Sequence, residues 1–166
     1  MSSPSPLYPL LNEINHAAAN GLPFLALAMT VALPDICVTL AYGRTTAKLY
    51  KDWCNANLGK EFSIVTADDL YSLRCGLLHN GRFGDLKNNV ARVIFALPGG
   101  ATFVNCRIND AYFYSVVEFC SNFTKAVNLW FETNKTDAAI QANIVNLMQY
   151  RVGGLLPYVA GATVLA

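Results

Sequence analysis

Residues 21–42 read GLPFLALAMTVALPDICVTLAY, and this stretch decides what kind of fold the chain can adopt. As an α-helix it is apolar on nearly every side, which is typical of a helix buried in a core. About 20 residues are enough to cross a bilayer. However, Pro23, Pro34 and Asp35 interrupt the run, and its flanks carry neither basic anchors nor aromatic belts. We therefore predict a central helix over Leu22–Ala41, kinked or broken near Pro34, inside a soluble domain.

Helical patterns continue on both sides of this central segment. Thr66 is a predicted N-cap, because Asp68 and Asp69 follow it in the first turn, where the helix dipole favours anions. That helix ends near His79-Asn80, with Gly81 as the left-handed residue that closes it. The other predicted helices run over Leu7–Ala19, Arg44–Leu58, Asn109 or Asp110 to about Glu132, and Thr136–Tyr150.

Two runs rich in β-branched and aromatic residues interrupt the helices. Val90–Leu97 and Ala101–Arg107 are separated by Pro98-Gly99-Gly100, a sequence typical of a turn. We predict that they form a two-stranded antiparallel hairpin inserted before the long helix. The predicted fold class is thus mainly α, a bundle of five to six helices with one inserted hairpin.

The chain shows no internal repeat and no linker, so one domain is predicted over residues 1–166. We predict a disordered start over residues 1–6 and no signal peptide, because the N-terminus lacks a basic region. Residues 152–166 are apolar, carry no charged side chain and contain two glycines in tandem. We predict that this tail docks on another surface.

The composition of the chain limits the classes of partner that it is expected to bind. Hydrophobic residues make up 54% of the chain and charged residues only 14%, so we expect apolar surface to be buried against a partner such as a second copy. The net charge of +1 predicts no global attraction to nucleic acid or membrane. Residues 70–107, however, hold five basic side chains against the single acid Asp85, which would attract a polyanion locally.

The five cysteines are widely spaced and form no CxxC pair, so neither a zinc site nor a disulfide framework is predicted. Buried free thiols in a reducing compartment explain them, and we expect a cytoplasmic protein. No cofactor or metal is expected, because no His or carboxylate cluster is evident.

Arg74 lies on the helix that begins at Thr66, at a position where its charge needs a partner. At 100° per residue it lies at the centre of an apolar stripe, where a guanidinium cannot remain unpaired. Either it pairs with a carboxylate, for which Asp35 in the central helix is the candidate, or the stripe faces a cleft or a subunit interface. His79 lies five residues on, about 140° around the same helix.

The segment LRCGLLHNGR, Leu73–Arg82, resembles the Arg-x4–6-His motif of the HEPN superfamily. In that family the motif lies at the C-terminal end of a helix in a small helical bundle. The resemblance covers residues 66–82 as a motif and residues 22–150 as a helix pattern, and the motif is similar to that of HEPN proteins from bacterial defence and toxin–antitoxin systems.

This resemblance implies metal-independent endoribonuclease chemistry at a two-fold dimer interface, with RNA as substrate and an antitoxin as partner. His79 would be the general acid or base, and Arg74 would stabilise charge on the phosphate. Asn80, Arg82 and Lys87 would bind the substrate. Cleavage would leave 2′,3′-cyclic phosphate ends, in stress or phage defence.

Other interpretations of the same residues remain open. Cys75 stands where catalytic members often carry a polar residue, so a non-catalytic HEPN-like interaction or assembly module is the alternative. Arg74 would then serve only in a structural ion pair with Asp35, and His79 would be a solvent-facing residue at a helix end. Arg82, Lys87 and Arg92 would be solvated loop residues. A third interpretation is a membrane-associated protein using residues 21–42.

Overall fold

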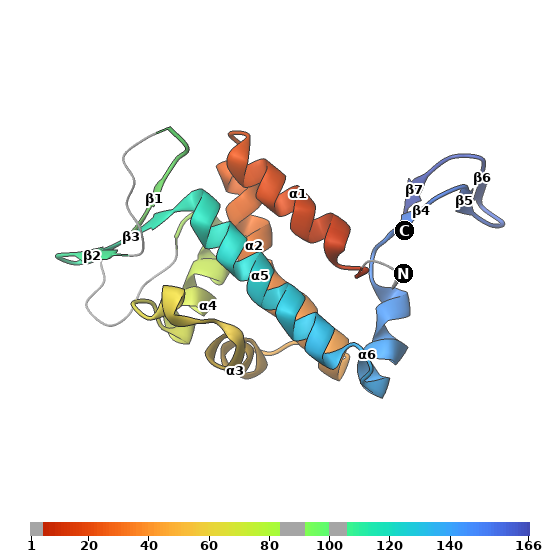
Figure 1. Cartoon of the computed structure of the whole chain (residues 1–166), viewed down its shortest axis with the longest axis horizontal. Helices are drawn as coiled ribbons and strands as arrows, with labels where there is room; N and C mark the ends of the chain where they lie inside the picture. The colour runs from red at the N-terminus through yellow and green to blue at the C-terminus, as the bar shows by residue number, and fades with distance from the viewer. Residues whose placement is uncertain (1–4, 84–91, 100–105) are drawn as a thin grey trace.

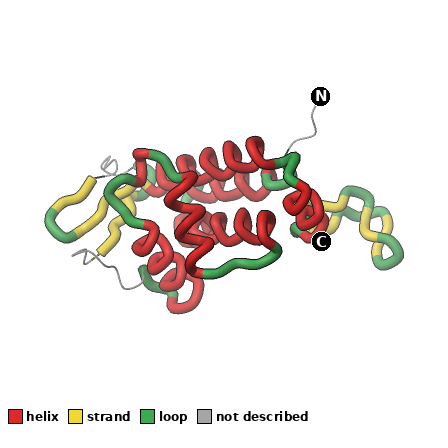
Figure 2. The backbone as a smooth tube through the Cα atoms, turned by 90° about the horizontal axis from the view of Figure 1, so that it is seen from below, coloured by secondary structure: helices red, strands yellow, loops and turns green. Residues whose placement is uncertain are grey.

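The computed structural model describes residues 5–83, 92–99 and 106–166. Within these ranges the chain is mainly helical, as predicted, and short strands lie at the two opposite ends of the helical body (Figures 1 and 2). The α-helices are α1 (Tyr8–Ala19), α2 (Pro23–Tyr42), α3 (Ala47–Asn57), α4 (Ala67–Cys75), α5 (Val116–Asn134) and α6 (Ala138–Asn143). Of the disordered start predicted over 1–6, residues 1–4 lie outside the described ranges. Ser5 is ordered, since its Oγ accepts a hydrogen bond from the Leu7 backbone N–H at 3.2 Å.

The central helix is α2. It packs against α1, α3, α4, α5 and α6, so apolar side chains are needed around nearly its whole circumference. Within the described ranges it is the one helix long and apolar enough to cross a membrane, with a mean hydropathy of 2.0. Half of that span is buried inside the structure, and the core helix of a soluble protein meets the same criterion.

Pro34 does not break α2. The helix runs from Pro23 to Tyr42 as one element, so the predicted break is wrong. A proline in a helix lacks the N–H that would bond four residues back, so the Thr30 carbonyl lacks its helical donor. In this region the buried Tyr50 hydroxyl donates a hydrogen bond of 2.9 Å to the carbonyl oxygen of Val31. A side chain from α3 thus supplies a donor to the turn before the proline.

The β-structure before α5 differs from the predicted hairpin. Three strands, β1 (Arg92–Ala96), β2 (Cys106–Ile108) and β3 (Ala111–Ser115), form a sheet in the order β1-β3-β2. β1 runs parallel to β3, and only β2 and β3 are antiparallel. The turn of the observed hairpin is therefore Asn109-Asp110, where Asn109 takes a left-handed φ of 53°. Residues 90, 91 and 100–105 of the predicted hairpin lie outside the described ranges.

Because of this sheet, the long helix begins later in the chain than predicted. The predicted N-cap at Asn109 or Asp110 is wrong, because residues 111–115 form the middle strand and α5 begins at Val116. Ser115 is the N-cap, and its hydroxyl accepts a hydrogen bond from the backbone N–H of Glu118. Tyr112 and Tyr114 alternate toward the core, which is the strand period of two rather than a helical period.

Aromatic side chains fill the junction between this sheet and the helices. Phe62 packs edge-on against Phe119 and Phe123 of α5, at ring-centroid distances of 5.5 and 4.9 Å. Phe119 also contacts Tyr114 of β3 at 5.3 Å. Edge-to-face packing of this kind adds stability beyond the burial of apolar area. The cluster anchors the segment between α3 and α4 and so fixes where α4 begins.

The C-terminal part of the chain contains less helix than predicted. Asp137, not Thr136, caps α6, and its carboxylate accepts hydrogen bonds from the backbone N–H groups of Ala139 and Ile140. α6 ends at Asn143, and one 3₁₀ turn, η3 (Ile144–Asn146), follows. The predicted helix up to Tyr150 is therefore wrong beyond η3.

The last residues form an arm that projects from the helical body (Figures 1 and 2). Two small antiparallel pairs build this C-terminal arm, residues 150–166: β4 (Tyr150–Arg151) with β7 (Val164–Leu165), and β5 (Gly154–Leu155) with β6 (Val159–Ala160). Gly154 is required, because its φ is +113° and a Cβ would lie 2.2 Å from the Val159 carbonyl oxygen. The apolar tail thus pairs with itself, and it contacts the helical body at its base, where the Tyr150 hydroxyl bonds to Glu13 of α1.

Candidate functional site

The helix that carries the predicted motif begins as expected. Thr66 is its N-cap. Thr66 and Asp69 form a capping box, in which each side chain accepts a hydrogen bond from the backbone N–H of the other residue. After Cys75 the helix continues as a π-helical turn, η2 (Gly76–Asn80). Gly81 ends it with a left-handed φ of 63°, as predicted, and its N–H bonds to the Gly76 carbonyl.

The π-helical turn brings Arg74 and His79 together. Sequence geometry places them on different faces of an α-helix, and this expectation is wrong because the last turn is not α-helical. A π turn bonds residues five apart, so it widens the helix and brings residue i+5 back over residue i. Arg74 Nη1 lies 3.0 Å from His79 Nε2. The two side chains, the Arg–His pair, therefore meet within one chain.

Asp35 of α2 holds the other side of the Arg74 guanidinium. Arg74 Nε donates to Asp35 Oδ2 at 2.8 Å, and the two side chains are 20% and 16% exposed. Burial opposes the charged form of Arg74, but its bond to Asp35 outweighs that effect and raises the pKa of Arg74. The second oxygen, Oδ1, accepts from the Thr45 hydroxyl at 2.7 Å. The carboxylate is thus held at both oxygens by Arg74 and Thr45.

These contacts determine the tautomer of His79. An arginine side chain only donates hydrogen bonds, so His79 Nε2 must be the acceptor in its contact with Arg74. The ring is then neutral and carries its proton on Nδ1. Protonation at Nε2 would set two donors against each other and break the contact. If another group bound Arg74 Nη1 and drew it away from His79, the lone pair on His79 Nε2 would be free to accept a proton.

Two residues beside the Arg–His pair were not predicted as part of the site. Cys75 Sγ lies 4.0 Å from Arg74 Nη1. Tyr71, four residues before Cys75 on α4, has its pKa raised by burial and by a hydrogen bond with the Cys75 thiol. The i, i+4 spacing of Tyr71 and Cys75 is the only sequence signal for this contact. Nothing in the sequence indicates Thr45.

The predicted substrate-binding residues are only partly brought to the pair. Asn80 and Arg82 are exposed at the end of η2 and directly beyond it, and the Arg82 N–H bonds to the Gly76 carbonyl at 3.1 Å. Lys87 lies outside the described ranges. Arg92 is exposed at the start of β1. The site that the described residues define is therefore Asp35, Arg74 and His79, with Thr45, Tyr71 and Cys75 around them.

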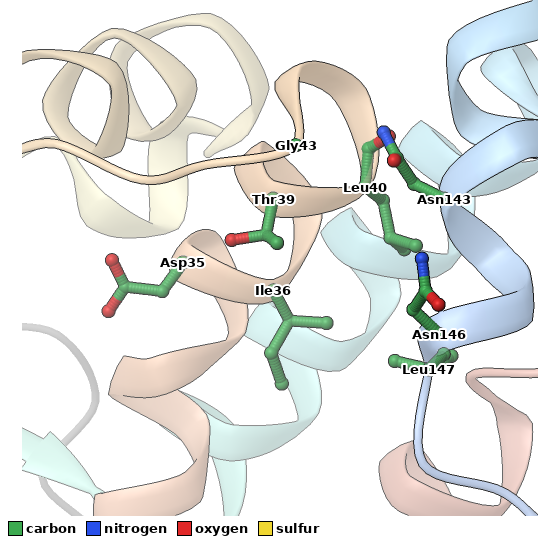
Figure 3. A pocket seen from close by; sticks show the side chains of 8 residues that line it. All are labelled: Asp35, Ile36, Thr39, Leu40, Gly43, Asn143, Asn146 and Leu147. Atoms are coloured by element: carbon green, nitrogen blue, oxygen red, sulfur yellow. The ribbon is translucent and has the colours of Figure 1, made fainter.

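A pocket of about 360 Å³ adjoins this site on the other side of Asp35. We call it the α2–α6 pocket. Figure 3 shows its lining side chains, Asp35, Ile36, Thr39 and Leu40 from α2, Gly43 at the end of α2, and Asn143, Asn146 and Leu147 from α6 and the residues after it. The Asp35 carboxylate points away from α6, toward the side on which Arg74 binds it (Figure 3).

Within the described ranges no three His, Cys, Asp or Glu side chains are grouped closely enough to hold a metal ion. All five cysteines are free thiols, of which Cys37, Cys54 and Cys120 are buried. A comparison of the chain with models of known protein families, with curated proteins and with solved structures finds no match. The function of the chain is therefore inferred from the chemistry of the site.

Proposed function

We propose that this chain is a HEPN-like domain that binds RNA and cleaves it without a metal ion. The single observation that carries the proposal is the contact between Arg74 Nη1 and His79 Nε2, 3.0 Å, at the end of α4. It joins a phosphate-binding cation to a proton acceptor at the C-terminal end of a helix. On the same reasoning we propose a cytoplasmic role in stress or phage defence, with an antitoxin as partner.

The proposed reaction uses the side chains as follows. A phosphate oxygen of the RNA binds Arg74, whose Nη1 leaves His79 while Nε stays on Asp35. His79 Nε2, now unbonded, takes the proton of the 2′-hydroxyl. The 2′-oxygen bonds to phosphorus, the bond to the 5′-oxygen breaks, and its electron pair goes to that oxygen, which takes up a proton. The products are a 2′,3′-cyclic phosphate and a 5′-hydroxyl.

A second copy supplies the proton donor in this proposal. One His79 cannot be unprotonated toward the 2′-hydroxyl and protonated toward the leaving oxygen at the same moment. His79 and Arg74 are accessible from outside the chain, since His79 is exposed and Arg74 partly so. A two-fold related copy would therefore place a second Arg–His pair on the opposite side of the same phosphate.

The test is RNA cleavage by His79→Ala in the presence of a chelator, scored for cyclic-phosphate ends. Loss of a general acid–base group typically lowers the rate by about 10²–10⁴. The His79 side chain is exposed and, among the described residues, hydrogen-bonds only with Arg74, so the variant should fold with an unchanged melting curve. His16→Ala is the matched control, because the His16 side chain is exposed on α1 and, within the described ranges, its ring hydrogen-bonds only with Asn20. Equal cleavage by wild type and His79→Ala would refute the proposal.

One observation favours a second candidate, the non-catalytic interaction or assembly module. The C-terminal arm exposes apolar side chains, among them Val152 at 87% and Tyr158 at 82%. Exposed apolar surface of this kind marks contact with a partner, and the partner proposed here is a second copy of the chain. Sedimentation velocity separates the candidates when it is combined with the cleavage assay: assembly with no cleavage of any RNA favours the module.

A further inference from the structure

The α2–α6 pocket has the shape and lining of a small-ligand site. Its volume of about 360 Å³ falls in the range of about 300–1,000 Å³ that such sites occupy. Ile36 and Leu40 of α2 face Leu147 across it, so two opposite walls are aliphatic (Figure 3). A flat, partly apolar molecule fits between walls of this kind.

The polar groups of the pocket have open hydrogen-bonding capacity. Asn143 Nδ2 donates to the Leu40 carbonyl at 2.9 Å, and because a carbonyl only accepts, this bond identifies the amide nitrogen. Asn143 Oδ1 is thus an acceptor with no partner in the described ranges. The Asn146 carboxamide is exposed and makes no hydrogen bond with any described residue, so both its donor and its acceptor are available. Thr39 adds a hydroxyl.

Asp35 connects the pocket to the Arg–His pair. Asp35 lines the pocket and binds Arg74 at 2.8 Å, while Arg74 contacts His79 at 3.0 Å. Thr39 lies one helical turn beyond Asp35 on α2. A ligand that places a phosphate on Arg74 would therefore find the pocket directly beside it, on the other side of Asp35.

We infer that the α2–α6 pocket binds a nucleobase of single-stranded RNA, and that adenine is the base it prefers. An asparagine carboxamide with both groups free pairs bidentately with adenine through N6 and N7, and Asn146 is such a group. Asn143 Oδ1 needs a donor, which the exocyclic N6 amine of adenine supplies, whereas uracil has no exocyclic amine and only its ring N3–H to donate. Proteins recognise the sequence of single-stranded RNA by binding its unstacked bases through hydrogen bonds of this kind. The inference rests on the proposed function, because it takes the ligand to be RNA.

The first experiment measures binding without cleavage. AMP and UMP are titrated against the full chain by NMR, with Asn146→Leu as the variant and Asn12→Leu as the matched control on α1. A good bidentate pair discriminates between bases by about 5- to 150-fold. We expect AMP to bind that much more tightly than UMP to wild type and to Asn12→Leu, and the preference to vanish in Asn146→Leu. Equal binding of AMP and UMP to wild type, or no binding of either, would overturn the inference.

The second experiment keeps this inference separate from the proposed function. Wild type and Asn146→Leu are compared on single-stranded RNAs that carry one adenosine in a run of uridines, and cleavage sites are mapped. Cleavage by wild type beside the adenosine, lost in Asn146→Leu, supports the inference. Cleavage with no base preference in either protein overturns it and leaves the nuclease intact. AMP binding that depends on Asn146, in a chain that cleaves nothing, supports the pocket and refutes the nuclease.

Discussion

At the scale of single residues, Asp35 organises the site. It is the only acid of α2 and lies at the side of an otherwise apolar helix, where a lone carboxylate would be costly. Arg74 and Thr45 each bond to one of its oxygens. The carboxylate thereby satisfies its own hydrogen bonding and at the same time holds Nε of the guanidinium, which leaves Nη1 to reach His79.

We expect Asp35→Ala to destabilise the fold. Removing one partner of a fully buried ion pair costs about 3–5 kcal/mol. Because Arg74 and Asp35 are 20% and 16% exposed, water partly screens the remaining charge, and we expect roughly 1–3 kcal/mol in urea unfolding.

Asp52→Ala is the control for that measurement. Asp52 pairs with Lys48 on the surface of α3 at 2.6 Å, and both side chains are more than half exposed. An exposed pair of this kind contributes little, so the unfolding curve should not move. Similar unfolding curves for Asp35→Ala and wild type would show that the Asp35–Arg74 pair does not stabilise the fold.

At the scale of elements, the π-helical turn η2 decides whether the site exists in one chain. Five residues of α-helix would carry His79 to the far side of Arg74, whereas the wider turn returns it to the same side. Gly81 ends this turn in the left-handed region, and its N–H closes the last bond to Gly76. The geometry of the Arg–His pair therefore depends on a residue that touches neither side chain.

Gly81→Ala tests this dependence. The left-handed conformation costs a residue with a Cβ about 1–2 kcal/mol, although a Cβ at Gly81 would meet no atom within 4 Å. We expect a loss of stability of about 1 kcal/mol and a clear loss of RNA cleavage, because relaxation of Gly81 would distort η2.

Gly21→Ala provides the matched comparison. Gly21 has a φ of 77° and likewise no atom within 4 Å of a built Cβ, but it follows α1, away from the site. The two variants should lose similar stability in thermal unfolding, while only Gly81→Ala should lose activity. Equal activity in the two variants would mean that η2 is not needed to hold the pair.

At the scale of the whole molecule, the chain has a packed helical body with a small sheet at one end and the C-terminal arm at the other (Figures 1 and 2). The arm contacts the body at its base, where the Tyr150 hydroxyl donates to the Glu13 carboxylate at 2.6 Å. Farther out its apolar side chains face solvent. Such a surface contributes little to the fold and is suited to contact with another copy of the chain.

The triple variant Val152→Ser, Leu156→Ser and Tyr158→Ser should therefore leave the fold intact and weaken self-association. These side chains are 87%, 78% and 82% exposed, and single surface substitutions usually change stability by less than about 0.5 kcal/mol. Thermal unfolding checks the first expectation, and sedimentation velocity over a range of concentrations checks the second. Leu129→Ser, 69% exposed on α5, controls for the loss of surface apolarity in general. An association constant equal to that of wild type would exclude the arm as the contact between copies.

The sequence by itself determined the features that depend on local chemistry and composition. The central helix follows from an apolar run that only a core can cover on all sides. Thr66 and Gly81 mark the ends of the motif helix, because a side-chain cap and a left-handed glycine act within one turn. The need of Arg74 for a carboxylate, with Asp35 as a candidate, follows from the cost of an unpaired buried charge.

Only the tertiary structure decided the features that depend on distant backbone partners. Residues 111–115 directly precede α5, yet they form a strand because β1 and β2 bond to their two edges. The apolar tail folds on itself through strand pairs that no local pattern specifies. The π turn that joins Arg74 to His79 belongs to the same class. A π-helical turn is rare and no local pattern in this segment specifies it, whereas α4 and η2 both pack against α2.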